Sequence, residues 1–164
     1  MTRIVLLAAA LTLLLAPAAA PASTRSIDIP KLFATQLQRA HAQTAVPILL
    51  PQTMRSDFKH HVPEGRARPG AWRFDIGAVR GCNGANACFV AQFSGVAGGK
   101  PNAPRTLRLA RGRTGYFQPM RCGASCSPPS IEWRERHTLY RIEAKFSRSE
   151  IVRMANSAIR NGPR

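Results

Sequence analysis

The sequence predicts an α+β fold, in which one antiparallel β-sheet is packed by an N-terminal and a C-terminal helix and stapled by two local disulfides. Three observations predict it. From residue 71 onward, short segments alternate apolar and polar residues and are separated by turns rich in Gly, Pro and Asn. One segment near residues 29–40 and another near residues 147–161 have helical periodicity instead. The four cysteines form two close pairs. We expect about six or seven strands in a meander.

Residues 1–22 have the order of a secretory signal peptide. Arg3 precedes the apolar run 4–15, and small residues follow up to Ala22. The apolar run is too short and too rich in alanine for a membrane span. We therefore expect cleavage after Ala22, a mature chain without a transmembrane segment, and a periplasmic or secreted location. Residues 23–164 then form a single α+β domain.

The first element of the mature chain is predicted to be a helix. Asp28 can cap its start, and Pro30 lies in the first turn, where a missing N–H costs nothing. One apolar stripe follows at helical spacing, made of Ile29, Phe33, Leu37 and Ala40. Residues 46–51 are then expected to form a short extended segment, an edge or entry strand rather than a central one, since a proline stands near each end.

Residues 52–70 are predicted to form a loop, the most mobile part of the domain. The segment is polar and contains Pro63, Gly65, Pro69 and Gly70, which interrupt regular structure. It also carries the adjacent His60 and His61.

The strands of the sheet are predicted from residues that alternate in and out. The inward positions are Trp72, Phe74, Ile76 and Ala78; Phe89, Ala91 and Phe93; Leu107 and Leu109; Ile131 and Trp133; and Tyr140, Ile142 and Ala144. Residues 114–117 form a further short segment. Polar residues between these positions indicate that the other face of the sheet is exposed to solvent.

The last element is predicted to be a helix with a capping box, in which Ser147 is the N-cap and Glu150 the third helical residue. Phe146 and Ile151 occupy the positions of a hydrophobic staple. The buried stripe comprises Ile151, Met154, Ala155, Ala158 and Ile159. Gly162 and Pro163 end the helix.

Cys82 with Cys88 and Cys122 with Cys126 are predicted to form disulfides, because thiols oxidise outside the cytosol. An Asn-Gly step between Cys82 and Cys88 indicates a hairpin turn, so we favour the local pairing. Pairing between the two clusters is the alternative, and a four-thiolate zinc site is a second one. The six-residue separation of the first pair is wide for a zinc knuckle.

The C-terminal part resembles certain exported bacterial domains. The resemblance lies in residues 131–133 (IEW), 139–142 (LYRI) and 150–157 (EIVRMANS). Similar strand–strand–helix endings occur in sigma-factor regulators and in lipoprotein-carrier-like domains. This resemblance implies a curved antiparallel sheet backed by helices, which in some of those proteins holds acyl chains. The whole chain looks like a small exported bacterial protein.

The charge of the chain is the main indication of its partner. The formal net charge is +16, and 20 of the 24 basic residues are arginines. Such a surface attracts an anionic polymer, lipid headgroups or an acidic protein, although a solvated basic surface would look the same. Arg105, Arg108, Arg111 and Arg113 surround one predicted hairpin and are the candidate anion-binding residues, since guanidinium groups bind phosphate and carboxylate in a bidentate manner.

The residues suited to catalysis are few. His60 or His61 could pair with Glu64 or His137 as the acid and base of a hydrolase, but no motif fixes such a pair. Nucleophile-elbow, P-loop and helical His-x-x-x-His patterns are absent from the sequence. We expect a non-enzymatic exported binding protein for an anionic ligand or surface, with no cofactor and no metal. A carrier of an apolar acyl ligand and a basic secreted nucleic-acid hydrolase are the alternatives.

Overall fold

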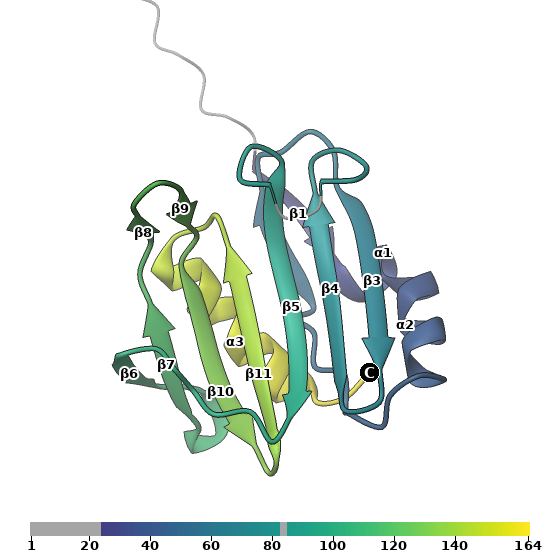
Figure 1. Cartoon of the computed structure of the whole chain (residues 1–164), viewed down its shortest axis with the longest axis vertical. Coiled ribbons are helices and arrows are strands. Elements are labelled where there is room, and N and C mark those ends of the chain that lie inside the picture. The colour runs from purple at the N-terminus through teal and green to yellow at the C-terminus, as the bar shows by residue number, and fades with distance from the viewer. Residues whose placement is uncertain (1–23, 83–84) are drawn as a thin grey trace, which may run out of the picture.

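The computed structural model describes residues 24–82 and 85–164 (Figure 1). The predicted signal peptide and the Asn83-Gly84 turn lie outside the described residues. The strands are β1 (Arg25–Asp28), β2 (Thr53–Ser56), β3 (Val62–Arg68), β4 (Ala71–Gly77), β5 (Phe89–Ala97), β6 (Arg105–Arg108), β7 (Thr114–Gln118), β8 (Arg121–Cys122), β9 (Cys126–Ser127), β10 (Ser130–Glu135) and β11 (Thr138–Ala144). The helices are α1 (Ile29–Leu32), α2 (Ala34–His41), the short 3-10 turn η1 (Ala110–Gly112) and α3 (Arg148–Asn161).

The α+β fold class is confirmed. Seven strands form one antiparallel sheet in the order β3-β4-β5-β11-β10-β7-β6. The order is not one continuous meander. The β3-β4-β5 meander is followed by residues 98–104, which carry the chain to the far edge, and the second half returns from β6 until β11 pairs with β5. The pairs β1-β2 and β8-β9 form two small separate sheets.

The helices cover one face of this sheet, with α3 behind the β10 and β11 half and α1 and α2 beside β3 (Figure 1). A row of aromatic rings crosses the covered face. Phe33 stacks on Phe74 at 5.0 Å between ring centroids, and Trp133 stacks on Tyr140 at 5.5 Å. The inward positions predicted for β4, β5, β10 and β11 are buried, except Ala78, which lies beyond the end of β4 and is half-buried. No helix within the described residues is both long and apolar enough to cross a bilayer.

The N-terminal helix begins as predicted, but it is broken into two. The Asp28 carboxylate accepts a hydrogen bond from the Lys31 backbone N–H at 2.9 Å. Phe33 departs from helical geometry between α1 and α2, with ψ of 16°. Phe33 and Ala40 are nevertheless buried, as the predicted stripe requires.

The prediction that residues 46–51 form an edge or entry strand is wrong. This segment joins the sheet at no point, and its only ladder contact in the described chain is an isolated bridge between Leu49 and Pro163. Ile48 and Leu50 are at most 1% exposed. The run is apolar because it is buried on both sides rather than because it pairs with a strand. Pro47 accepts hydrogen bonds from Trp72 Nε1 and Tyr140 OH, both at 3.1 Å.

The prediction of a loop over residues 52–70 is also wrong, because both β2 and β3 lie there. Pro63 and Gly65, which suggested a loop, are both compatible with the edge strand β3. β3 is an edge strand, where Pro63 is tolerated. Gly65 lets α2 approach, since a Cβ at this position would lie 2.7 Å from Gln36 Cγ and 2.9 Å from Phe74 Cδ1.

Helix α3 has the predicted N-cap but not the full capping box. Ser147 Oγ accepts a hydrogen bond from the Glu150 backbone N–H at 3.3 Å. The Glu150 carboxylate does not return to Ser147. It accepts instead from the Arg55 backbone N–H at 3.1 Å and from Arg153 Nη2 at 2.5 Å. The Glu150 carboxylate therefore bonds to two donors outside the first turn of α3. Its bond to the Arg55 N–H joins α3 to β2. The predicted buried stripe of α3 is confirmed residue for residue.

This carboxylate should make stability depend on pH. Hydrogen bonding from Arg153 lowers the pKa of Glu150 below its ordinary 4.5. A lowered pKa stabilises the fold above 4.5, and that contribution is lost as the pH falls through the folded-state value. We expect Glu150→Gln to reduce the free energy of unfolding by about 1 kcal/mol at pH 7 and by much less at pH 3. Urea unfolding at both pH values measures the difference. The exposed Asp57→Asn is the control, and an equal loss at pH 3 would refute the assignment.

Candidate anion-binding surface

Both predicted disulfides are present, with the predicted local pairing. Cys82 bonds Cys88 in the connection between β4 and β5, and Cys122 bonds Cys126 between β8 and β9. All four cysteines are therefore paired, and none is available as a thiolate ligand. No cluster of three or more potential metal ligands occurs in residues 24–82 and 85–164.

The four candidate arginines lie along the β6 edge and the turn after it. Arg105 begins β6 and Arg108 ends it, and the register places them on opposite faces of the sheet. Arg111 lies in η1 with φ of 54°, and its Nη2 donates to the Arg160 carbonyl oxygen at 2.8 Å. Arg113 Nε lies 3.8 Å from Glu135 Oε1. The structure thus brings the four to one edge of the sheet rather than to one face.

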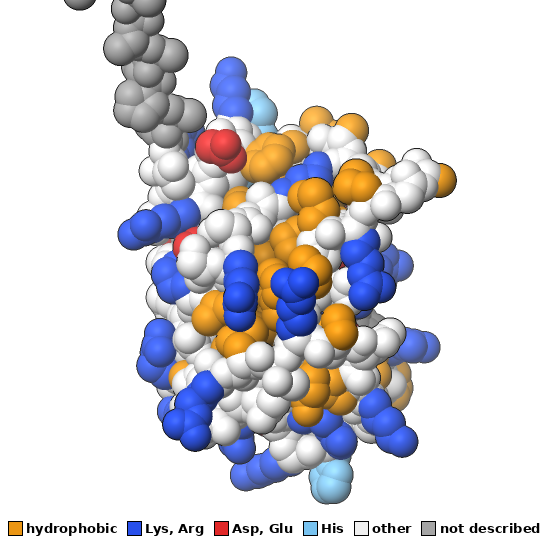
Figure 2. Space-filling model, turned by 90° about the vertical axis from the view of Figure 1, so that its left-hand side faces the viewer, with side chains coloured by type: hydrophobic (Ala, Val, Ile, Leu, Met, Phe, Trp, Pro, Cys, Tyr) orange, Lys and Arg blue, Asp and Glu red, His pale blue; other side chains and the backbone are white. Residues whose placement is uncertain are grey.

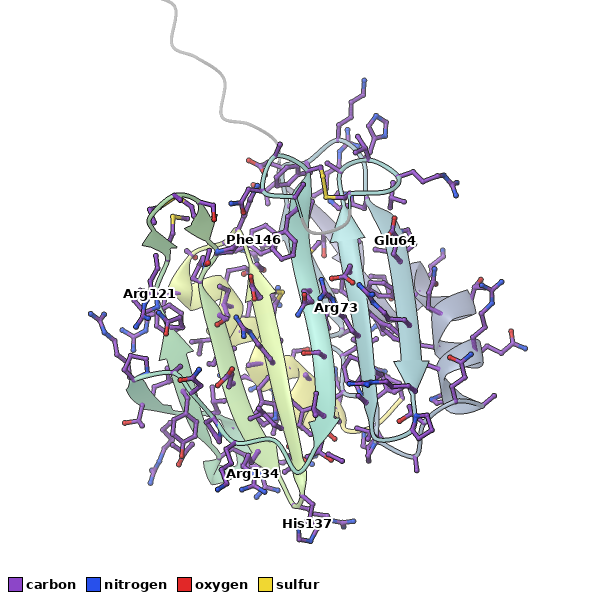
Figure 3. The ribbon with its side chains drawn as sticks, in the orientation of Figure 1. Glu64, Arg73, Arg121, Arg134, His137 and Phe146 are labelled. Atoms are coloured by element: carbon purple, nitrogen blue, oxygen red, sulfur yellow. A yellow bond between two sulfur atoms is a disulfide. The ribbon has the colours of Figure 1, made fainter. Side chains whose placement is uncertain are left out.

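Two further arginines join this edge. The Arg148 guanidinium, at the first residue of α3, lies 5.4 Å from the centre of the Phe117 ring. Phe117 is the cross-strand neighbour of Arg105 on the same face, so α3 brings a cation beside β6. Arg121, on β8, is also exposed and lies at the same side of the molecule (Figure 3). We call Arg105, Arg108, Arg111, Arg113, Arg121 and Arg148 the basic edge.

Acidic residues are scarce at the basic edge. The sequence has no Asp or Glu between Asp75 and Glu132, although seven basic residues fall in that interval. The view onto this side shows Lys and Arg side chains around a central strip of hydrophobic ones, with few acidic side chains (Figure 2). Met120, 55% exposed, lies next to Arg121. Only Arg113 of these six arginines contacts a carboxylate within the described residues, that of Glu135. The edge therefore combines largely uncompensated positive charge with exposed apolar surface.

The carboxylates gather elsewhere, on the sheet face that no helix covers. Four of the eight acidic residues of the chain lie there: Glu64, Asp75, Glu132 and Glu143. Three of them, Asp75, Glu132 and Glu143, form ion pairs with arginines of the same face. Arg141 pairs with Glu143 at 2.6 Å and with Glu132 at 3.7 Å. Burial raises the pKa of Asp75, and the nearby Arg73 guanidinium opposes this shift.

The histidines do not form a His–His pair. His60 and His61 precede β3, whereas His137 lies in the turn at the opposite end of the sheet (Figure 3). His61 Nε2 lies 2.9 Å from the buried Ser56 Oγ, and burial lowers the pKa of His61. Glu64, the other proposed partner, accepts a hydrogen bond from the Gly81 backbone N–H at 2.9 Å. The described residues thus provide no acid–base pair among these side chains.

The space between the sheet and the helices is filled by side chains. Phe33, Phe74, Phe93, Ile151 and Met154 come from both layers, and all are 0% exposed.

Sequence reasoning found four residues of the basic edge from their spacing. It missed Arg121, and it missed Arg148, which reaches the edge only because α3 places it over Phe117 of β7. No known protein family, no curated protein and no solved structure matches this chain.

Proposed function

We propose that this chain is an exported binding protein without enzymatic activity, and that its basic edge binds an anionic ligand or surface. The observation that carries the proposal is the gathering of six arginines on one edge whose strands and turns contain no acidic residue. Within the described residues, only Arg113 of the six contacts a carboxylate. A guanidinium group without such a partner keeps its donors for phosphate or carboxylate groups outside the chain.

The shape of the basic edge favours an extended anion over a small one. Arg105 and Arg108 point to opposite faces of a four-residue strand, so a small ion contacting both is excluded. A polymer or a lipid surface can contact both sides of an edge. The exposed Met120 adds an apolar contact, which suits the boundary between headgroups and acyl chains.

The proposed location rests on the disulfides and on residues 1–22. Disulfides persist in oxidising compartments and are rare in the cytosol, and this chain has two. We propose that the signal peptide directs export and that the oxidised domain works in the periplasm or outside the cell.

The proposal is tested by measuring binding of the oxidised mature chain to anionic phospholipid vesicles and to RNA. We expect binding at low salt and a steep loss of affinity at high salt, because neutralising phosphates releases counterions. Vesicles of neutral lipid are the control and should not bind. Absence of binding at low salt to both anionic probes would refute the proposal, and the preferred probe would identify the class of anion.

A further inference from the structure

The uncovered face of the sheet is divided by the crossover segment 98–104. This segment passes in front of β11 and β10 (Figure 1), and the Asn102 backbone N–H donates to Glu132 Oε2 at 2.8 Å. The other half of the face, over β3, β4 and β5, stays open. It holds a groove of about 500 Å³, lined by residues that include Arg66, Arg68, Arg73, Gln92, Ser94 and Val96. We call it the β3–β5 groove.

Two arginines face each other across the first two strands of the groove. Arg66 on β3 and Arg73 on β4 are directly opposed in the register and point to the same side. Like charges at such a position destabilise a sheet. Arg66 is exposed and has no ion pair within the described residues. The pair therefore lowers the stability of the fold, and Asp75 offsets the repulsion only in part.

Asp75 holds Arg73 in a way that leaves most of its donors unused. Arg73 Nε donates to both carboxylate oxygens of Asp75 at 2.9 Å. Its two terminal nitrogens have no acceptor within the described residues, and they carry the paired N–H groups that fit a carboxylate or a phosphate. Asp75 thus positions the guanidinium without occupying its binding end. Glu64 and Arg73 lie on this uncovered face (Figure 3).

A third arginine, Arg141, lies on the same cross-strand row as Arg66 and Arg73, but its charge is neutralised. Arg141 on β11 has two carboxylate partners, Glu132 and Glu143. On the open half, Arg66, Arg68 and Arg73 share two carboxylates, those of Glu64 and Asp75, and only Arg73 makes an ion pair within the described residues. The sheet therefore neutralises its arginines under the crossover segment and leaves a net positive charge where the groove is open.

The third strand supplies neutral donors and an apolar contact. Ser94 is the β5 neighbour of Arg73, and Gln92 is the neighbour of Asp75. Neither side chain makes a hydrogen bond within the described chain, so both hydroxyl and amide remain available. Val96 is 42% exposed one position further along the face, opposite Ala71. The groove therefore combines an anion-binding end with a small apolar floor.

We propose that the β3–β5 groove is a binding site for a small molecule that joins a carboxylate or phosphate group to a short apolar group. Arg66 and Arg73 bind the charged group, Ser94 and Gln92 donate to it, and Ala71 and Val96 contact the apolar part. The site is separate from the basic edge, and it requires neither RNA nor a lipid surface.

The test is an NMR titration of the oxidised mature chain at constant ionic strength with four probes: acetate, butyrate, inorganic phosphate and butyl phosphate. We expect saturable shifts of the backbone amides of residues 66–73 and 92–96. Butyrate or butyl phosphate should bind more tightly than acetate or phosphate. Binding by one head group only would assign the ligand as a carboxylate or a phosphate, and either result supports the site.

Variants then separate this site from the net charge of the chain. Arg66→Gln and Arg73→Gln should each lower the affinity about tenfold or more, because each removes charge-assisted hydrogen bonds. Arg66 has no internal partner, so its variant keeps the fold. The matched control, Arg105→Gln, removes the same charge from the basic edge and should leave this affinity unchanged. An equal loss in the control, or the absence of saturable shifts in the groove, would overturn the proposal.

Discussion

Phe74→Ala should reduce the free energy of unfolding by about 3–5 kcal/mol, the range for removing a buried aromatic ring. Phe74 is 0% exposed and lies in the middle of β4. Its ring contacts both layers, since it stacks on Phe33 of the helical layer and lies 5.3 Å from the ring of Trp72. Gly65 sits against its edge. Removing the ring leaves a cavity between the two layers, which the neighbouring side chains fill only in part.

Chemical denaturation of the oxidised chain measures this effect. A loss of this size is a large part of the 5–15 kcal/mol that ordinary domains have, so Phe74→Leu is a second variant that keeps most of the volume. Val79→Ala is the control. Val79 is 56% exposed and should cost no more than about 0.5 kcal/mol. A Phe74→Ala effect as small as that of the control would contradict the packing described above.

Replacing Arg105, Arg108, Arg111 and Arg113 together by glutamine should lower the affinity for anionic vesicles roughly thousandfold. A basic residue near an anionic membrane contributes about 1 kcal/mol, and four such contributions give a change of this order. The substitution keeps side chains of similar length and polarity. Co-sedimentation with vesicles at low salt measures the effect, and the dependence of the affinity on salt should also become shallower.

A matched variant tests whether the edge or the total charge is responsible. Replacing Lys31, Arg39, Lys59 and Arg80 by glutamine removes the same charge from exposed positions outside the basic edge. This variant should keep most of the affinity, because surface charges more than a Debye length from the contact are screened. If both variants lose affinity equally, the protein binds through its net charge alone.

Elements governed by local rules could be predicted from the sequence. α3 was predicted with its N-cap, its buried stripe and its stop at Gly162, since each depends on residues within a few positions. The inward residues of β4 and β5 were predicted for the same reason. The disulfides also join neighbours in the chain, so close spacing was sufficient to pair them.

Elements governed by distant neighbours could not be predicted. β3 contains Pro63 and Gly65, and only the edge position and the approach of α2 make a strand there acceptable. Residues 46–51 are buried by contacts with the C-terminus, which no local pattern indicates. The opposition of Arg66 and Arg73 requires the register of β3 with β4, and Arg148 reaches the basic edge only because α3 packs behind β7.

The position of β11 has a consequence for the order in which the chain can fold. β11 is the last strand in the sequence, yet it lies in the centre of the sheet between β5 and β10. The β3-β4-β5 half exposes an unpaired strand edge until β11 is available. Pairings between distant segments form slowly, so neither half completes its sheet before the whole chain is present. A chain whose C-terminus is still missing therefore lacks the central strand of its sheet, which suits the proposed export of the chain before it folds.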